Sequence, residues 1–425
     1  MREDKGMQIA NRKYKVEKNE ISEQEKKTWK YLLYLIGCAL RKCKPNNIPE
    51  LYMWEQLLKI AEYNNVEAVA WPAVNMLQDS IPEDIFRRWS ENARKVLHRM
   101  ILFDIEREKI LLAMEKAGIS WLTLKGINIQ QYYPNPGMRY MCDNDILYGL
   151  LESFEDGIYG VKGMTSEEKE RNTKKAQSVL CDIMTNLGFE RKSILGNHDV
   201  YYKQPVLNFE MHRELIPRGV LPIDYYENPW KRAIVNNEFE HGFHFNDEDE
   251  YIYMIVHAFK HYTGSGCGVR TLCDEFVYLQ KKQEVMDWEY VDEELEKLGV
   301  LEFERRIKLL VNHVFLYQEK ITESDLEMLK YMFSNGTYGN AETKVLNEMQ
   351  KLRNSKKYKG KSVKLGYIIN RIVKNEEDMK EFYPFFYRHK SIRWLLPIVR
   401  LIKGIIKHPQ KLINEIKILT EVGRS

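Results

Sequence analysis

Apolar residues recur every three or four positions through the N-terminal part of the chain, from Thr28 to about Ala113. This spacing is typical of amphipathic helices. It is interrupted at residues 44–47 (KPNN) and 80–82 (SIP), which favour turns or helix starts. We therefore expect a helical N-terminal region over residues 28–115. The charged stretch before it, residues 1–27, is predicted to be a disordered tail.

The pattern then changes to short β-rich runs separated by helical spacing. Strands are expected at 119–124 (ISWLTL) and 139–148 (RYMCDNDILY), with a helix at 127–135 between them. A second helical pattern covers 176–190, and residues 198–216 predict two strands joined by a turn at Gln204-Pro205. The Gly-rich, charged segment 149–172 is expected to be a flexible loop. Residues 116–245 thus predict a small domain, and the fold class is α+β with a mixed sheet between helical regions.

Helical spacing returns from Asp247, so residues 246–375 are expected to form a helical C-terminal domain. A lysine-rich connector, NSKKYKGKSVK, covers residues 354–364. The last segment, 376–425, is a basic amphipathic tail. It is compatible with contact to a membrane surface or with packing on the domain or a partner. Its basic face would carry Arg400, Lys403, Lys407 and Lys411, opposite Trp394, Ile398, Leu401, Ile402 and Ile405.

Composition narrows the class of protein. The formal net charge of +3 is too small to indicate nucleic-acid binding by itself, so a nucleic-acid partner is not favoured. The six cysteines are scattered without CxxC spacing, which argues against a zinc site and a disulfide framework. The N-terminus lacks a signal-peptide pattern, and no run of about 20 apolar residues is present. A cytoplasmic location is expected.

Two aspartates separated by one residue are the first candidate for chemistry. On a strand, Asp143 and Asp145 would share one face, while Asn144 and Ile146 would point the other way. Adjacent carboxylates repel each other unless a cation lies between them, and Mg²⁺ prefers oxygen ligands. The alternative is a strand-end turn or a surface pair.

A third carboxylate follows in the second predicted hairpin. Glu210 and His212 share the polar face of a strand whose opposite face is apolar. If this strand lies beside the first, Glu210 completes a cluster of three carboxylates, which can hold two metal ions. The alternative is that Glu210 is an exposed strand residue.

Lys125 and Gly126 mark a strand-to-helix corner that could hold phosphate. A glycine there lets backbone N–H groups approach an anion, the helix N-terminus favours negative charge, and Lys125 adds a cation. Arg139 could neutralise a phosphate or pair with the aspartates.

One helical face further along carries His257, Lys260 and His261, at spacings of three and four. It would line a nucleotide or acceptor pocket, or be a partly buried polar face. Arg270 could also reach a nucleotide, or form an intrahelical ion pair with Asp274, four residues later.

This order of motifs resembles the bacterial family of uncharacterised nucleotidyltransferases, within the superfamily that includes DNA polymerase β. The most specific motifs are Leu124-Lys125-Gly126, Tyr133-Pro134-Asn135-Pro136-Gly137-Met138-Arg139 and Asp143-Asn144-Asp145. Less specific matches are Glu210-Met211-His212, His257 with His261, and Arg270 with Asp274. The resemblance covers about residues 28–280.

The resemblance implies a nucleotidyltransferase core that transfers NMP from an NTP, ATP foremost, to an unknown acceptor hydroxyl and releases pyrophosphate. Asp143, Asp145 and Glu210 would hold Mg²⁺ or Mn²⁺. The nucleotide would contact Lys125, Gly126, Arg139, His212, His257, Lys260, His261 and Arg270. Two alternatives remain open. One is an inactive nucleotide-binding or scaffolding relative, since the wider superfamily has Gly-Ser or Gly-Gly where Lys125-Gly126 stands here. The other is a toxin-like enzyme that modifies tRNA.

Overall fold

The computed structural model describes residues 22–154, 157–194, 196–217, 220–221, 224–355, 362–373, 376, 379, 383–407 and 409–421. These residues divide into two compact units. The first lies within 19–259 and 269–333, and the second within 260–268 and 334–425. Most of the predicted N-terminal tail and part of the lysine-rich connector lie outside the described residues. The finer division into five parts stays a prediction.

The N-terminal region of the first unit is helical, as the apolar spacing predicts. The first of its described helices begins at a capping box. The Ser22 side chain accepts from the Glu25 backbone N–H, and the Glu25 carboxylate accepts from the Ser22 backbone N–H. The side chains of Leu32, Leu33 and Ile36 are fully buried in this region. The helices are α2 (Glu23–Leu40), α3 (Met53–Asn64), α4 (Glu67–Asn75) and α5 (Glu83–Lys116).

A seven-stranded mixed sheet forms the middle of the first unit, in the order β5-β6-β7-β2-β1-β9-β8. Strand β2 pairs antiparallel with β1 and parallel with β7, so it is central. The strands are β1 (Ser120–Thr123), β2 (Asn144–Gly149), β5 (Glu190–Ile194), β6 (His198–Lys203), β7 (Leu207–His212), β8 (Ile234–Val235) and β9 (Gly242–His244).

Several predicted boundaries differ from those observed. The second strand begins at Asn144 instead of Arg139, so Asp143 lies just before it. The segment predicted to be a loop contains the hairpin β3 (Leu151–Ser153) and β4 (Tyr159–Val161). It also contains the start of α7 (Ser166–Asn186), where Thr165 and Glu168 form a capping box that charge and glycine content obscured.

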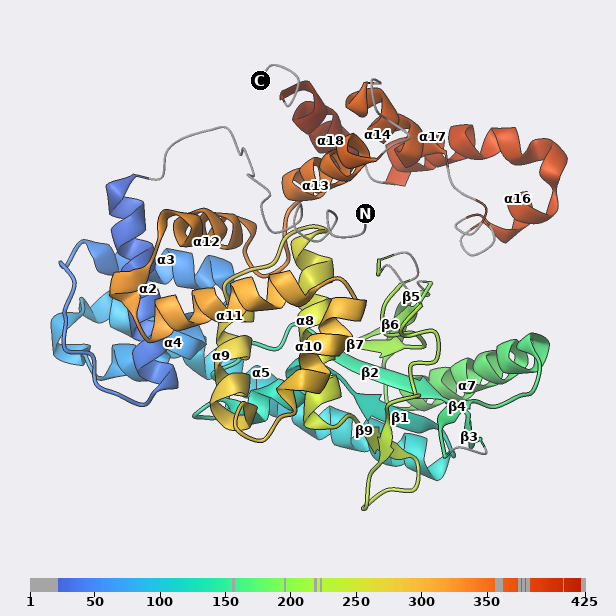
Figure 1. Cartoon of the computed structure of the whole chain (residues 1–425), viewed down its shortest axis with the longest axis horizontal. Helices are drawn as coiled ribbons and strands as arrows, with labels where there is room; N and C mark the ends of the chain where they lie inside the picture. Colours follow the sequence, from blue (N-terminus) through green and yellow to red (C-terminus); the bar gives the residue numbers. More distant parts are fainter. Residues whose placement is uncertain are drawn as a thin grey trace. The chain divides into compact units, whose positions relative to one another are not determined.

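Two long helices, α5 and α7, cover one face of the sheet (Figure 1). Phe103 of α5 and Leu180 of α7 join Phe209 and Met211 of β7 in a buried cluster. The apolar side chains of β2 and β7 therefore face these helices, and the alternate polar positions face the other way. That second face carries the candidate site.

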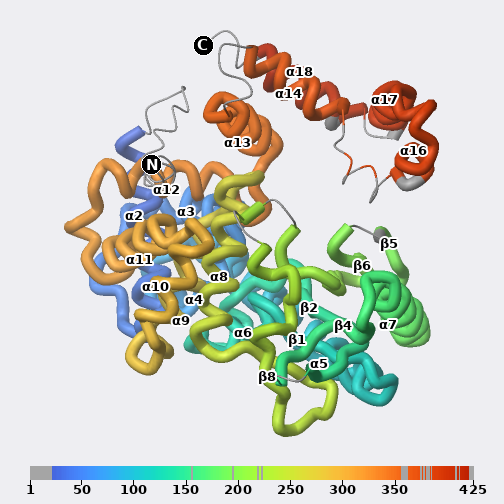
Figure 2. Tube along the Cα trace, turned by 45° about the vertical axis from the view of Figure 1, so that its right-hand side comes forward, coloured from blue at the N-terminus to red at the C-terminus, as the bar shows by residue number. Residues whose placement is uncertain are grey.

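The remaining helices of the first unit pack beside the sheet and against the N-terminal helices. Helix α8 runs next to strands β2 and β7 in both views (Figures 1 and 2). Helix α11 packs on α2 and α9. The helices are α6 (Gly126–Ile129), α8 (Asp247–Tyr262), α9 (Arg270–Lys282), α10 (Trp288–Lys297), α11 (Leu301–Phe315) and α12 (Glu323–Asn335), with short 3-10 turns η1 (Gln78–Ser80), η2 (Gln130–Tyr132) and η3 (Gln318–Lys320).

The second unit is helical over its described residues. Its elements are α13 (Ala341–Asn354), α14 (Val363–Ile372), α16 (Pro384–Arg388), η5 (Lys390–Leu395), α17 (Leu396–Lys407) and α18 (Pro409–Glu421). Glu415 of α18 links to α14 by accepting hydrogen bonds from Tyr367 and Arg371. None of the described helices is both long enough and apolar enough to cross a membrane.

Candidate functional site

Asp145 and Glu210 are direct partners on the neighbouring parallel strands β2 and β7. Partners in register project from the same face of a sheet, so the two carboxylates lie side by side. The predicted adjacency of these strands is confirmed. Which ligand the carboxylates bind stays a prediction.

Asp145 is almost fully buried and contacts two cationic or potentially cationic groups. Its Oδ1 lies 3.0 Å from Nζ of Lys125 and 2.6 Å from Nε2 of His212. Burial would raise the pKa of Asp145, but Lys125 and His212 hold it well below its usual range. Burial would likewise lower the pKa of Lys125, and the charges of Asp145 and Asp143 raise it above its usual value. Both groups are therefore charged at neutral pH.

Lys125 reaches this position through an unusual backbone conformation. Its φ is 50° and its ψ is −117°, a combination that L-residues rarely adopt. The Lys125 carbonyl oxygen accepts from the N–H groups of Asn128 and Ile129, and the N–H of Leu124 donates to the Asp145 carbonyl oxygen. Lys125 is thus both strained in its backbone and part of a buried ion pair. Residues with a strained backbone cluster at functional sites.

Asp143 lies on the approach to β2 and not within the strand. Burial and the nearby charge of Asp145 raise the pKa of its carboxyl group, while Lys125 and Arg270 oppose the increase. The two aspartates are therefore close enough to repel each other, which is the situation in which a bound cation stabilises both.

Arg139 pairs with Asp274 of α9 and not with Asp143 or Asp145. Its Nε and Nη2 lie 2.8 Å from Oδ1 and Oδ2 of Asp274, and Tyr133 donates to the same Oδ1 at 2.8 Å. Gly126 makes room for this arginine, since a Cβ there would lie 2.3 Å from Arg139 Nη1. The Lys-Gly and Pro-Gly-x-Arg motifs thus pack as one unit. The helix that follows Lys125 contributes little attraction for phosphate through its N-terminus, because α6 has only four residues.

Arg270 holds the segment that leads to Asp143. Its Nη1 donates to the Tyr140 carbonyl oxygen at 2.9 Å and to Cys142 Sγ at 3.1 Å. Arg270 and Asp274 therefore do not form the intrahelical pair expected as an alternative. Each binds the segment 133–142 separately, Arg270 through Tyr140 and Asp274 through Arg139. A phosphate-binding role for Arg139 and Arg270 stays a prediction.

Two arginines of α5 that the sequence pattern did not single out support the same segment. Arg99 donates to the carbonyl oxygens of Met141 and Cys142 at 2.6 and 2.9 Å. Arg107 donates to Asn144 Oδ1 at 2.9 Å. They were missed because a helix with many charges gives no local indication of which one turns inward.

Helix α8 contributes Tyr253, another residue that the sequence pattern did not indicate. Burial and the charges of Asp145 and Glu210 raise the pKa of its hydroxyl, and Lys125 opposes them. The ring of His257 lies one turn further along the same face, with its centroid 6.2 Å from that of Tyr253. Lys260 and His261 belong to the second compact unit. Roles for the three predicted residues of α8 in binding stay predictions.

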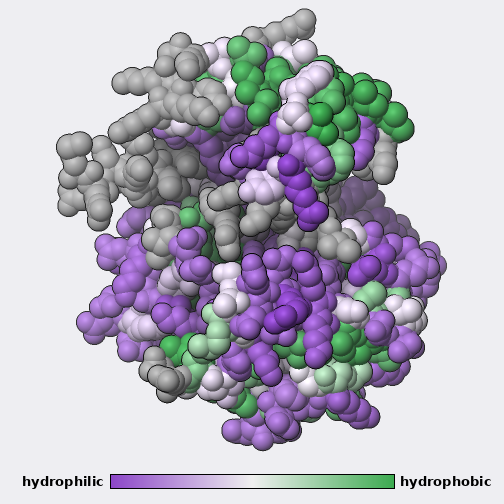
Figure 3. Space-filling model, turned by 90° about the vertical axis from the view of Figure 1, so that its right-hand side faces the viewer, coloured by the Kyte–Doolittle hydropathy of each residue, from purple (hydrophilic) through white to green (hydrophobic). Residues whose placement is uncertain are grey.

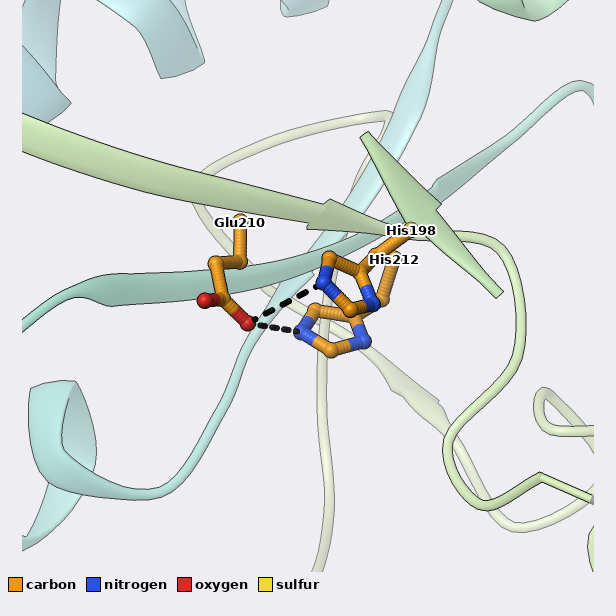
Figure 4. A group of neighbouring side chains, drawn as sticks. All are labelled: His198, Glu210 and His212. Atoms are coloured by element: carbon orange, nitrogen blue, oxygen red, sulfur yellow. Dashed lines mark ion pairs between the residues drawn. The ribbon is translucent and has the colours of Figure 1, made fainter. Parts of the chain in front are cut away.

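His198 completes a group of side chains around Glu210 (Figure 4). Its Nε2 lies 3.5 Å from Glu210 Oε2, and Nε2 of His212 lies 3.8 Å from the same oxygen. The sequence did indicate that His198 lies near the site, because a hairpin that turns at Gln204-Pro205 places His198 opposite His212. No rule of spacing within one strand could have shown it.

Comparison with known proteins identifies one family. The model of a family described as uncharacterised nucleotidyltransferases matches residues 52–153 and 173–316, more than half of the chain. The match includes all seven strands of the central sheet and the helices α8 and α9, whereas β4 lies between its two segments. Neither the curated proteins nor the solved structures yield a match.

Proposed function

The chain belongs to this family of nucleotidyltransferases, and on that premise we propose that it transfers NMP from an NTP to an acceptor hydroxyl, with release of pyrophosphate. The observation that carries the proposal is the pairing of Asp145 with Glu210 beside Asp143. ATP is the proposed donor, and the cytoplasm is the proposed location.

The donor set fits a hard divalent cation. Asp143, Asp145 and Glu210 offer carboxylate oxygens, which Mg²⁺ and Mn²⁺ prefer. Burial and, after it, the negative charge of Asp145 raise the pKa of Asp143, and a bound cation would offset that charge. When bound, the metal would neutralise charge on the triphosphate and lower the pKa of the acceptor hydroxyl.

The other residues have distinct roles in this proposal. Lys125, charged and next to Asp145, would balance negative charge where the phosphates enter. Glu210, which is less buried than Asp145, would accept the proton of the acceptor hydroxyl directly or help to hold the metal. Arg139 and Arg270 would fix the segment before Asp143, because their guanidinium groups are bound to protein atoms.

A second candidate function has one observation in its favour. Lys125 and His212 together neutralise Asp145, so the carboxylate is satisfied by the protein's own groups. This would suit a relative that binds nucleotide without turnover. A tRNA-modifying enzyme is a third option, to which the net charge of +3 adds little support.

Two measurements separate the transferase from the inactive relative. The melting temperature is recorded with each NTP, with and without Mg²⁺, because a ligand that binds the folded state raises it. Release of pyrophosphate is then followed for the nucleotide that binds best. Binding with turnover supports the transferase, and binding without turnover in the presence of diverse hydroxyl acceptors supports the inactive relative.

A further inference from the structure

His198, Glu210 and His212 form a compact group at the edge of the candidate site. One ligand atom of each lies within 4.8 Å of the others. Figure 4 shows both imidazoles directed at the same carboxylate oxygen of Glu210. The two rings lie nearly face to face, with centroids 4.9 Å apart and planes 30° apart.

The sheet itself sets this geometry. His198 of β6 is the direct partner of His212 on β7, and Glu210 lies two residues before His212 on the same face. The His212 side chain is 5% exposed, whereas those of His198 and Glu210 are 16% and 25% exposed. Three donors are thus held on paired strands, and a path from solvent remains open.

Two of the three donors, the imidazole nitrogens of His198 and His212, differ in kind from those proposed for Mg²⁺, and Glu210 is common to both sets. Two imidazole nitrogens and one carboxylate oxygen suit Zn²⁺ and neighbouring transition metals, whereas Mg²⁺ takes oxygen ligands. Two histidines and one glutamate also leave a fourth position of a tetrahedral zinc ion open. We propose that His198, Glu210 and His212 bind one divalent transition-metal ion of the zinc class.

Binding would change the contact between His212 and Asp145. Nε2 of His212 lies 2.6 Å from Asp145 Oδ1, and an ionised carboxylate only accepts, so this nitrogen carries the shared proton. A metal bound to Nε2 displaces that proton to solvent, and Asp145 becomes available as a fourth ligand. Glu210 and Asp145 also belong to the proposed Mg²⁺ set, but the two imidazole ligands favour an ion of the zinc class over Mg²⁺ at this position.

Cobalt is a suitable probe because Co²⁺ in a tetrahedral site with nitrogen ligands absorbs strongly in the visible range, and the aqua ion absorbs weakly. The full-length chain is stripped with a chelator, exchanged into buffer and titrated with CoCl₂. We expect one Co²⁺ per chain with a tetrahedral spectrum, which ZnCl₂ removes and excess MgCl₂ leaves in place. A spectrum that stays that of the aqua ion overturns the proposal without the need for any variant.

Variants assign the ligands. His198→Ala and Glu210→Gln should each weaken zinc binding by more than about tenfold, since loss of even a second-shell partner weakens metal binding about 10–100-fold. His98→Ala is the matched control, because His98 is an exposed histidine on α5. Circular dichroism confirms folding of each variant. Unchanged zinc affinity in folded His198→Ala overturns the assignment.

An independent observation concerns the second unit, where apolar side chains of α17 and its neighbours are exposed. Hydrophobic residues, coloured green, gather in the upper part of Figure 3. Arg400 instead turns inward, because its Nη1 donates to the Ile372 carbonyl oxygen of α14. The outward-facing residues are each about half exposed or more: Trp394, Ile398, Leu401, Ile402, Ile405 and Ile406.

The charge around this apolar face identifies its occupant. Between residues 384 and 421 the sequence has eight basic residues, Arg388, Lys390, Arg393, Arg400, Lys403, Lys407, Lys411 and Lys417, and two acidic ones, Glu415 and Glu421. An apolar helix face flanked by lysine and arginine is the pattern of helices that lie in the interface of an anionic bilayer. We infer that α17 binds the surface of an anionic membrane.

Vesicle flotation tests this inference. The chain should float with vesicles that contain equal parts of phosphatidylcholine and phosphatidylglycerol, and much less with phosphatidylcholine alone. Ile402→Asp should abolish flotation, and Leu309→Asp, at an exposed leucine of α11, should not. No flotation with anionic vesicles overturns the inference. So does a stable dimer that Ile402→Asp converts to monomer, because the apolar face would then bind a second copy.

Discussion

Asp145 and Glu210 lie opposite each other on parallel strands, although 65 residues separate them in the chain. Lys125 follows β1, the other neighbour of β2, and its ammonium lies 3.0 Å from Asp145. Three neighbouring strands therefore supply the charged centre of the site, and the helices on the far face hold those strands in register.

Gly126→Ala should destabilise the first unit. A methyl group would lie 2.3 Å from Arg139 Nη1, so the arginine must move from its pair with Asp274. Overpacking a buried site costs about 1–3 kcal/mol, and a weakened ion pair adds to it. Urea denaturation measures the change. Gly404→Ala is the control, because the added methyl group meets nothing within 4 Å; an equal loss in both variants would contradict this account.

Asp274→Asn should destabilise the chain strongly. It leaves the buried Arg139 guanidinium without a counter-charge, which typically costs about 3–5 kcal/mol. Arg139→Met combined with Asp274→Leu removes both charges and should recover much of that loss. If the double variant loses as much stability as Arg139→Met and Asp274→Leu lose together as single variants, the two residues are not coupled.

Lys125→Gly and Lys125→Ala separate the role of the ammonium from that of the backbone. Both remove the counter-charge of Asp145, but only glycine adopts a positive φ readily. We expect Lys125→Gly to be more stable than Lys125→Ala by about 1 kcal/mol or more, measured by thermal unfolding. Equal stability would mean that the backbone at this position carries no strain.

Glu275 should make stability depend on pH. Burial is the main cause that raises its pKa to about 8, while a hydrogen bond from the Tyr251 hydroxyl opposes the increase. A carboxyl group whose pKa is higher in the folded state stabilises the fold at low pH, and this contribution is lost as pH rises through about 8.

Glu275→Gln should therefore lose less stability than the wild type between pH 5 and pH 8, in urea denaturation at several pH values. Glu284→Gln changes an exposed residue in the segment after α9 and is the control. Identical pH profiles for the wild type and Glu275→Gln would contradict the buried-carboxyl explanation.

Local patterns predicted the central strands well. Short β-rich runs identified β1, β2, β6 and β7, and in β7 the apolar and polar residues also alternate, because one face of that strand packs on α5 and α7. Strands β5, β8 and β9 were missed. β8 and β9 have only two and three residues, and β5 has the sequence ERKSI, whose charged positions hide the alternation.

The site was predictable in part for the same reason. Asp145 and Glu210 could be found as polar positions on apolar strands, and Asp143 through its spacing of two residues from Asp145. The partner of Arg139 could not, because Asp274 lies 135 residues away and on a helix. Tyr253 looked like an ordinary core residue of α8, since nothing in its local pattern distinguishes an aromatic side chain that packs from one that faces a charged cluster.

Mg²⁺-dependent release of pyrophosphate from the best-bound NTP tests the central claim most directly, with the wild type, Asp145→Asn and Asp182→Asn measured side by side. Asp182 is an exposed aspartate of α7 and serves as the control. Loss of a metal ligand removes several kcal/mol of transition-state stabilisation, so we expect Asp145→Asn to be slower by at least about a hundredfold and Asp182→Asn to be unchanged. Turnover by Asp145→Asn at the wild-type rate would contradict the account.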